Sequence, residues 1–134
     1  MTADPIEPGS PARQALVLDD SSAICGLLKM VMERRGYQVR SFEDLETALH
    51  YLAADRRKVS LAMVDVLLPG LSGVEFAHRL RALQPGTAVV LSSGRGLEEE
   101  QSDWLRSHGA LFLQKPFNLT QLAATLTEAE ARVA

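Results

Sequence analysis

Short apolar runs alternate along the chain with segments whose apolar residues recur every three or four positions. The runs are rich in aliphatic residues and end at polar or turn-forming residues, a pattern typical of strands buried on both faces of a parallel sheet. The run at 61–70 is closed by Pro69-Gly70 and carries one charged residue, Asp65, near its carboxyl end. Together the runs cover residues 14–18, 38–42, 61–70, 87–91 and 110–113.

Between the runs, apolar side chains follow the i, i+3, i+4, i+7 spacing of helices that bury one face. Gly36 is placed to end the first helix, whose stripe consists of Ile24, Leu27, Leu28 and Val31. Residues that cap helices precede three later stripes: Ser41 with Asp44, Ser72 with Glu75, and Asn118. The weakest helical pattern belongs to residues 97–107, whose apolar anchors are Leu97, Trp104 and Leu105.

Five strand–helix units in alternation predict an α/β fold. The expected architecture is a doubly wound, five-stranded parallel sheet with helices on both faces, joined by right-handed crossovers. Residues 1–13 hold three of the six prolines and show no periodicity, so we expect a flexible N-terminal tail. The single domain then spans residues 14–134, a length that suits one hydrophobic core.

Composition narrows the class of protein. The chain is 46% hydrophobic and carries a net charge of -3 without a basic run, which argues against binding nucleic acid or a membrane surface. No apolar stretch approaches a membrane span and no signal peptide is visible, so we expect a cytoplasmic protein. The only cysteine, Cys25, lies in a helical pattern that favours burial. The histidines show no metal-ligand spacing and are expected at the surface or at helix ends: His50, His78 and His108.

Polar side chains collect at the ends of the predicted strands. Asp19 and Asp20 follow the first strand, Asp65 lies in the third, and Ser92 and Lys115 follow the fourth and fifth. Because the carboxyl ends of parallel strands share one edge, we expect these groups to converge. Three carboxylates alone would raise one another's pKa values, whereas Mg²⁺ with oxygen ligands relieves the repulsion. An ammonium and a hydroxyl suit phosphoryl oxygens, so the set indicates phosphoryl transfer to an aspartate nucleophile.

With these residues in this order, the sequence resembles the receiver domain of response regulators. The resemblance is to the CheY-like type that consists of a single domain. The resemblance covers residues 14–131 and implies a flavodoxin-like/CheY-like sheet with strand order 2-1-3-4-5. It rests on Asp19-Asp20, on Asp65 with Leu68-Pro69-Gly70 and Gly73, on Ser92, and on Lys115-Pro116-Phe117.

The resemblance implies a phosphoacceptor and a metal site. Asp65 would accept the phosphoryl group from a histidine kinase or a phosphotransfer protein, and Lys115 would bind that group. Asp20 would hold Mg²⁺ directly and Asp19 mostly through water. Asp65 and the backbone carbonyl of Leu67 would complete the protein ligands of the metal.

The resemblance also implies a switch. Ser92 would move toward a phosphoryl oxygen, Phe112 stands in the place of the aromatic switch residue, and the Lys115-Pro116 peptide would be cis. Phe112 lacks the hydroxyl of the tyrosine that many members carry. Leu67 is apolar where some members position hydrolytic water, and Gly94, two residues after Ser92, has no side chain. These departures predict a phosphorylated form that decays slowly.

The predicted function is therefore a single-domain response regulator that catalyses only its own phosphorylation and dephosphorylation. No output domain is expected after the last helix, so a downstream protein target, a homodimer or onward phosphate transfer would carry the signal. In this family the surface formed by the fourth helix, the fifth strand and the fifth helix usually changes on phosphorylation, and here it would carry Trp104 and Phe112. Trp104 is also consistent with a residue of the hydrophobic core. Met30 and Met32 fall off the first helical stripe, either as an exposed dimer or kinase contact or as residues packed at the helix margin.

Two other classes of protein are alternatives to a response regulator. A haloacid-dehalogenase-like phosphatase requires a second aspartate two residues after the nucleophile, and Leu67 stands there after Asp65. A degenerate receiver that acts as a phosphorylation-independent interaction module is the alternative that remains. Phosphate uptake at Asp65 separates this alternative from the main interpretation.

Overall fold

A computed structural model describes residues 13–54, 57–68 and 72–132. The predicted flexible tail lies outside the described residues except for Arg13, which opens the first strand. The elements in chain order are β1 (Arg13–Leu18), α1 (Ser22–Arg34), β2 (Tyr37–Phe42), α2 (Leu45–Ala54), β3 (Val59–Asp65), α3 (Gly73–Leu83), β4 (Ala88–Ser93), α4 (Glu99–Ser107), β5 (Leu111–Gln114) and α5 (Leu119–Arg132).

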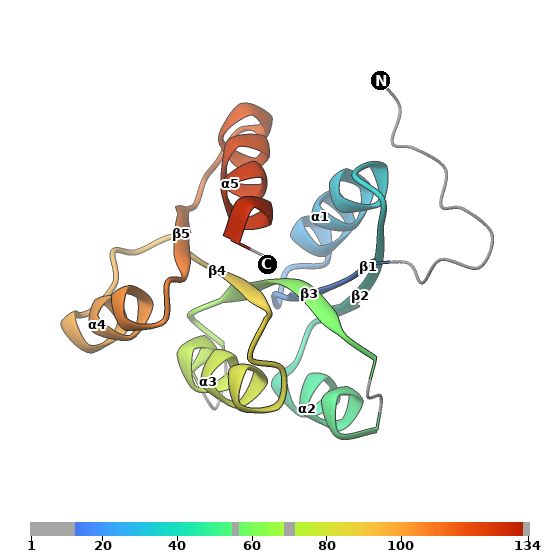
Figure 1. Cartoon of the computed structure of the whole chain (residues 1–134). Helices are drawn as coiled ribbons and strands as arrows, with labels where there is room; N and C mark the ends of the chain where they lie inside the picture. Colours follow the sequence, from blue (N-terminus) through green and yellow to red (C-terminus); the bar gives the residue numbers. More distant parts are fainter. Residues whose placement is uncertain (1–12, 55–56, 69–71, 133–134) are drawn as a thin grey trace.

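The five strands form one parallel sheet in the order β2-β1-β3-β4-β5. Helices α1 and α5 cover one face of the sheet, and α2 and α3 cover the other, with α4 beside β5 (Figure 1). The predicted fold class and strand order are confirmed. Each strand is joined to a parallel neighbour through a helix, which places all carboxyl ends of the strands on one edge of the sheet.

Side chains alternate between the two faces along each strand, and two apolar clusters result. Val17 and Met63 pack in the cluster beneath α1 and α5. Leu16 and Val64 pack in the cluster beneath α2 and α3. Burial on both faces explains why the central strands have continuous apolar sequences rather than alternating ones. No helix in the described part of the chain is both long and apolar enough to cross a membrane.

The helix starts agree with the predicted caps at two of three places. Ser72 Oγ accepts a hydrogen bond from the N–H of Glu75, and Asn118 Oδ1 accepts one from the N–H of Gln121. The predicted cap pair Ser41-x-x-Asp44 is wrong, because Ser41 lies in β2 and the helix begins four residues later, at Leu45. Asp44 itself caps α2, since its Oδ1 accepts the N–H of Thr47 at 2.8 Å. Gly36 and Gly109 follow α1 and α4 with positive φ, as expected for glycines that end helices.

The interpretation of Met30 and Met32 as a pair off the main stripe of α1 is wrong for Met32. Met32 is 0% exposed and packs in the core, whereas Met30 is 46% exposed. Met32 lies four residues after Leu28 and seven after Cys25, both of which are buried. That spacing places the three side chains on one face of the helix. Only Met30 remains available as a surface contact of the kind the sequence suggested.

Candidate functional site

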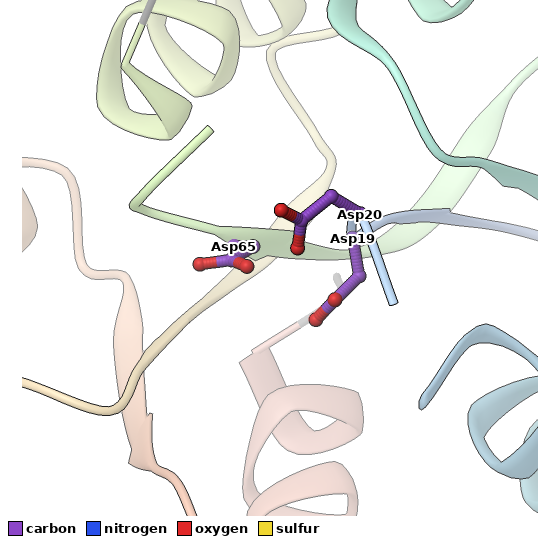
Figure 2. Close-up of side chains that lie close together, drawn as sticks. All are labelled: Asp19, Asp20 and Asp65. Atoms are coloured by element: carbon purple, nitrogen blue, oxygen red, sulfur yellow. The ribbon is translucent and has the colours of Figure 1, made fainter. Parts of the chain in front are cut away.

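Three carboxylates meet at the carboxyl edge of the sheet (Figure 2). Asp19 and Asp20 follow β1, and Asp65 is the last residue of β3. Each contributes one carboxylate oxygen to a group whose atoms all lie within 4.8 Å of one another. Asp19 and Asp65 are buried, with Asp65 only 6% exposed, while Asp20 is exposed to solvent. The convergence predicted from the strand ends is therefore present in the structure.

Lys115 bridges the two buried carboxylates. Its Nζ donates to Asp19 Oδ2 at 2.6 Å and to Asp65 Oδ2 at 3.3 Å. Lys115 follows β5, so the ammonium reaches across the carboxyl edge to the ends of β1 and β3. The shorter contact is with Asp19, which leaves Asp65 the less tightly held of the two carboxylates.

The buried site shifts the pKa values of its groups. Burial raises the pKa of Asp65, and the negative charge of Asp19 adds to this effect, while the Leu67 N–H and Lys115 act against it. Burial alone would lower the pKa of Lys115, but its hydrogen bond to Asp19 and the charges of both carboxylates raise it. Lys115 therefore stays protonated at neutral pH, and it is available as a fixed positive charge beside Asp65.

The turn after β3 holds Asp65 in place. The N–H of Leu67 donates to Asp65 Oδ1 at 3.0 Å, and the N–H of Gly73 donates to the carbonyl of Val66 at 3.1 Å. A Cβ atom on Gly73 would lie 2.0 Å from the Asp65 carbonyl oxygen, so α3 begins in direct contact with the strand end. Only glycine allows this close approach. Leu67 itself is 50% exposed.

The hydroxyl groups at the end of β4 differ in their surroundings. Ser92 lies opposite Asp65 in the sheet register, and its Oγ donates to the carbonyl of Leu113 at 2.8 Å. Ser93 is the last residue of β4, and its Oγ accepts the N–H of Arg95 at 3.1 Å. Both side chains are buried. Two adjacent serines thus end β4, and the sequence prediction names only Ser92 as a site residue.

Phe112 lies on β5 opposite Leu91 and packs against the cluster beneath α2 and α3. Because side chains alternate along a strand, Ser93 faces the same side of the sheet as Leu91 and Phe112, and Ser92 faces the other side. Ser92 therefore shares its face of the sheet with Asp65, and the two side chains line one small pocket together with Asp19. The Lys115-Pro116 peptide is cis, as the resemblance implied.

The donor set fits a hard divalent cation. Three carboxylates within reach of one point supply the oxygen ligands that Mg²⁺ prefers, and the exposed Asp20 opens the group to solvent waters. The single Lys115 ammonium leaves the cluster with net negative charge. Among these residues, Asp19, Asp20 and Asp65 would hold the cation, which would neutralise the carboxylates and polarise a bound phosphoryl group.

Comparison with known proteins places the chain in a family. The model of the response regulator receiver domain matches residues 15–127, so the chain belongs to the receiver domains of two-component response regulators. Such domains are signalling modules that bind Mg²⁺ at an acidic pocket and interact with histidine kinases and output domains. The identification proposed from the strand-end residues is confirmed.

Curated relatives with a similar sequence are regulators. The probable transcriptional regulatory protein TcrX of Mycobacterium tuberculosis is 28% identical over 83% of this chain and 47% of its own length. The nitrogen assimilation regulatory protein NtrX of Azorhizobium caulinodans is 33% identical, over 83% of this chain and 24% of its length. The phosphate regulon transcriptional regulatory protein PhoB of Escherichia coli is 29% identical over 91% of this chain and 53% of its own length. The chain thus spans about half or less of these relatives.

Solved structures agree with the fold. A CheY-like receiver domain protein from Methanospirillum hungatei has a TM-score of 0.78 and 25% identity, covering 91% of this chain and 97% of its own. A response regulator from Burkholderia pseudomallei, solved with a phosphorylated aspartic acid, calcium ion and citrate, has a TM-score of 0.72 and 30% identity. That match covers 89% of this chain and 69% of the other.

Proposed function

We propose that this receiver domain accepts a phosphoryl group on Asp65 from a histidine kinase or a phosphotransfer protein, in a reaction that requires Mg²⁺. The observation that carries the proposal is the pairing of two buried carboxylates, Asp19 and Asp65, with the single Lys115 ammonium. Neutral Asn would suffice if the role of Asp65 were only structural. An acidic group kept in a buried, under-neutralised cluster is instead suited to nucleophilic attack.

In the proposed transfer, Asp65 is the nucleophile and Lys115 stabilises the phosphoryl group. An Asp65 carboxylate oxygen attacks phosphorus and forms the new P–O bond, while the bond from phosphorus to the donor nitrogen breaks and its electron pair stays on the donor imidazole. Lys115 Nζ, already 3.3 Å from Asp65 Oδ2, donates to a phosphoryl oxygen of the product. Asp19, Asp20, Asp65 and the backbone carbonyl of Leu67 would hold Mg²⁺, which would supply the remaining positive charge.

The switch hydroxyl is the part of this proposal with two candidates. Ser92 is the residue proposed from the sequence, and its hydroxyl must leave Leu113 O to reach a phosphoryl oxygen. Ser92 lines the pocket that holds Asp65, whereas Ser93 lies on the face of the sheet that holds Phe112. The variants Ser92→Ala and Ser93→Ala separate them: the true switch residue, when replaced, uncouples phosphorylation from chemical-shift changes around Phe112.

Phosphorylation would change a surface that binds a downstream protein or a second copy of the chain. We also propose that the protein is located in the cytoplasm. The side chain of Phe112 is the proposed switch residue in that change. We also propose slow loss of the phosphoryl group, because the apolar side chain of Leu67, two residues after Asp65, cannot position a water for attack. Leu67→Asn is expected to speed the decay of the phosphorylated form several-fold. An unchanged lifetime in that variant would reject this part.

The test of the central step is intact mass after incubation with acetyl phosphate and Mg²⁺, for the wild type and Asp65→Asn. We expect one added phosphoryl group in the wild type only, and none when EDTA is present during the incubation. A gain of mass in both proteins would move the phosphoacceptor away from Asp65. No gain, even from partner kinases, would favour the alternative, a receiver that acts as a phosphorylation-independent interaction module.

A further inference from the structure

A cavity of about 550 Å³ opens at the edge of the sheet opposite to Asp65. Arg81 of α3 and Arg132 of α5 form two of its walls. The turn that leads into β4, at residues 85–88, and the turn between α4 and β5, at His108 and Gly109, complete it. The volume lies within the range of small-molecule sites in proteins. Because it lies at the starts of β4 and β5, the cavity is separate from the phosphorylation site at the strand ends.

Arg81 is held rigidly in the wall of this cavity. Its Nε donates to Thr87 O at 2.6 Å, and its Nη1 donates to His108 O at 2.9 Å. These bonds connect α3 to the start of β4 and to the residue that ends α4. Burial lowers the pKa of Arg81, and within residues 13–54, 57–68 and 72–132 no carboxylate pairs with it. The guanidinium is thus a half-buried positive charge without an anionic partner there, an arrangement that a bound anion would stabilise.

Arg132 supplies a second guanidinium from the last turn of α5. Its Nη1 donates to Gly109 O at 2.6 Å, which fixes the side chain over the turn after α4. Its Nη2 lies 3.4 Å from Glu128 Oε1, in a pair whose side chains are 43% and 60% exposed. Exposed ion pairs of this kind contribute little. Glu128 therefore leaves most of the positive charge of Arg132 available to a ligand in the cavity.

We propose that this cavity binds a small multivalent oxyanion, with its phosphate or carboxylate groups between Arg81 and Arg132. A planar guanidinium presents paired N–H donors to such groups. Donors that are already held in place lose less conformational freedom when a ligand binds. The carboxyl end of α4 disfavours an anion nearby, but the carbonyls of His108 and Gly109 already accept N–H donors from the two arginines. The site does not depend on the phosphorylation of Asp65.

The test is a titration of the unphosphorylated protein, without Mg²⁺, followed by amide chemical shifts. Inorganic pyrophosphate and citrate serve as the phosphate and carboxylate probes, and the tighter probe identifies the class of ligand. We expect the largest shift changes at Thr87 and Gly109. Arg132→Gln should weaken binding about tenfold, as expected for loss of a hydrogen bond to a charged group. Glu128→Gln should tighten binding, since it removes the competing carboxylate.

Arg79→Gln is the matched control, because it makes the same change of charge on an exposed part of α3. We expect Arg79→Gln to bind the probe with the affinity of the wild type. An equal loss of affinity in Arg79→Gln and Arg132→Gln would mean that the anion is attracted only by the net charge of the protein, and it would overturn the proposal. Arg81→Lys keeps the charge and tests the paired donors without emptying the wall of the cavity. Shift changes confined to Lys115, or no shift changes at millimolar probe, would also overturn the proposal.

Discussion

At the scale of single residues, burial of the Asp65 carboxylate lowers the stability of the folded protein. Burial raises the pKa of Asp65, so its ionised form is less favourable in the folded chain than in the unfolded chain. The free energy of unfolding therefore decreases as pH rises from the ordinary aspartate range through the raised pKa. The ionised form of Asp65 in the folded protein therefore costs stability on the alkaline side of that range.

Replacement of Asp65 should relieve that cost. Asp65→Asn removes the buried charge while Asp19 keeps its 2.6 Å contact with Lys115. We expect the Tm at pH 7 to rise by about 2–5 °C, the change that about 1 kcal/mol produces in a chain of this size. Thermal unfolding followed by circular dichroism measures it, and the difference should disappear in acid, where wild-type Asp65 is protonated. A lower Tm for the variant at pH 7 would mean that the contact between Asp65 and Lys115 outweighs burial.

Gly73 is a second residue whose identity the structure explains. A methyl group at this position would meet the backbone of Asp65 at 2.0 Å, and a backbone carbonyl cannot rotate away as a side chain can. Gly73→Ala should therefore destabilise the protein by about 2 kcal/mol or more and displace the phosphoacceptor strand end. Chemical denaturation measures the first effect, and the rate of phosphorylation by acetyl phosphate the second.

Gly26 provides the control for this substitution. It lies in α1 with open space around the position of a Cβ atom. Gly26→Ala should leave phosphorylation unchanged and stabilise the protein by about 0.5–1 kcal/mol, since alanine is the better helix former. Equal behaviour of the two variants would mean that the start of α3 can move away from the strand without loss.

At the scale of elements, a polar cluster ties α5 to the end of α1. Arg35 Nε and Nη2 donate to Glu130 at 3.2 and 2.5 Å, and Tyr37 OH donates to the same carboxylate at 2.9 Å. Burial acts to raise the pKa of Glu130, but the hydrogen bonds from Arg35 and Tyr37 outweigh it and lower the pKa. Burial and the bond to Glu130 raise the pKa of Tyr37 to about 12.

The lowered pKa of Glu130 gives a pH dependence with a definite sign. The stabilisation is present above the ordinary glutamate range and is lost as pH falls through the lowered pKa of the folded state. Glu130→Gln should cost about 1–2 kcal/mol at pH 7, in line with hydrogen bonds to charged groups. The cost should shrink toward zero in acid. Denaturation of both proteins across pH measures it, and a cost that stays constant with pH would assign the effect to packing instead.

Helix α4 is attached differently from the other helices. It has no buried residue, and Trp104 holds it through contacts at the edge of the cluster beneath α2 and α3. Trp104 Nε1 donates to His78 Nδ1 at 3.3 Å, and the His108 ring stacks on the indole at 4.3 Å. The expectation of surface and helix-end histidines is confirmed, but two of them meet around Trp104. Sequence spacing could not show this contact, because α3 and α4 come together only when both pack against the same face of the sheet.

At the scale of the whole molecule, metal binding and folding are linked. A cation held by Asp19, Asp20 and Asp65 would join the ends of β1 and β3, so it would bind the folded chain better than the unfolded chain. Millimolar Mg²⁺ should raise the Tm of the wild type by a few degrees, and EDTA should reverse the rise. Asp20→Asn should reduce the effect with little change in the Tm without metal, since Asp20 is exposed. An equal rise in wild type and variant would place the stabilising cation elsewhere.

The fold and the main site residues follow from local patterns that a sequence carries openly. Apolar runs of strand length, helical stripes and glycine stops predicted all five strand–helix units, and the strand ends predicted the convergence of Asp19, Asp20, Asp65 and Lys115. These predictions succeed because parallel topology converts a position along each strand into a position at a shared edge. One predicted helix start differs from the structure, since α2 begins at Leu45 after an Asp44 cap and Ser41 takes no part in the cap.

Contacts between elements were decided only by the tertiary structure. The sequence by itself determined the class of fold, the family and which charged groups share an edge, because these depend on periodicity and order. Burial of Met32, the face that Ser93 occupies, and the cavity between Arg81 and Arg132 depend on how helices rotate and strands register against one another. Those quantities are set by packing between residues distant along the chain, and no local pattern contains them.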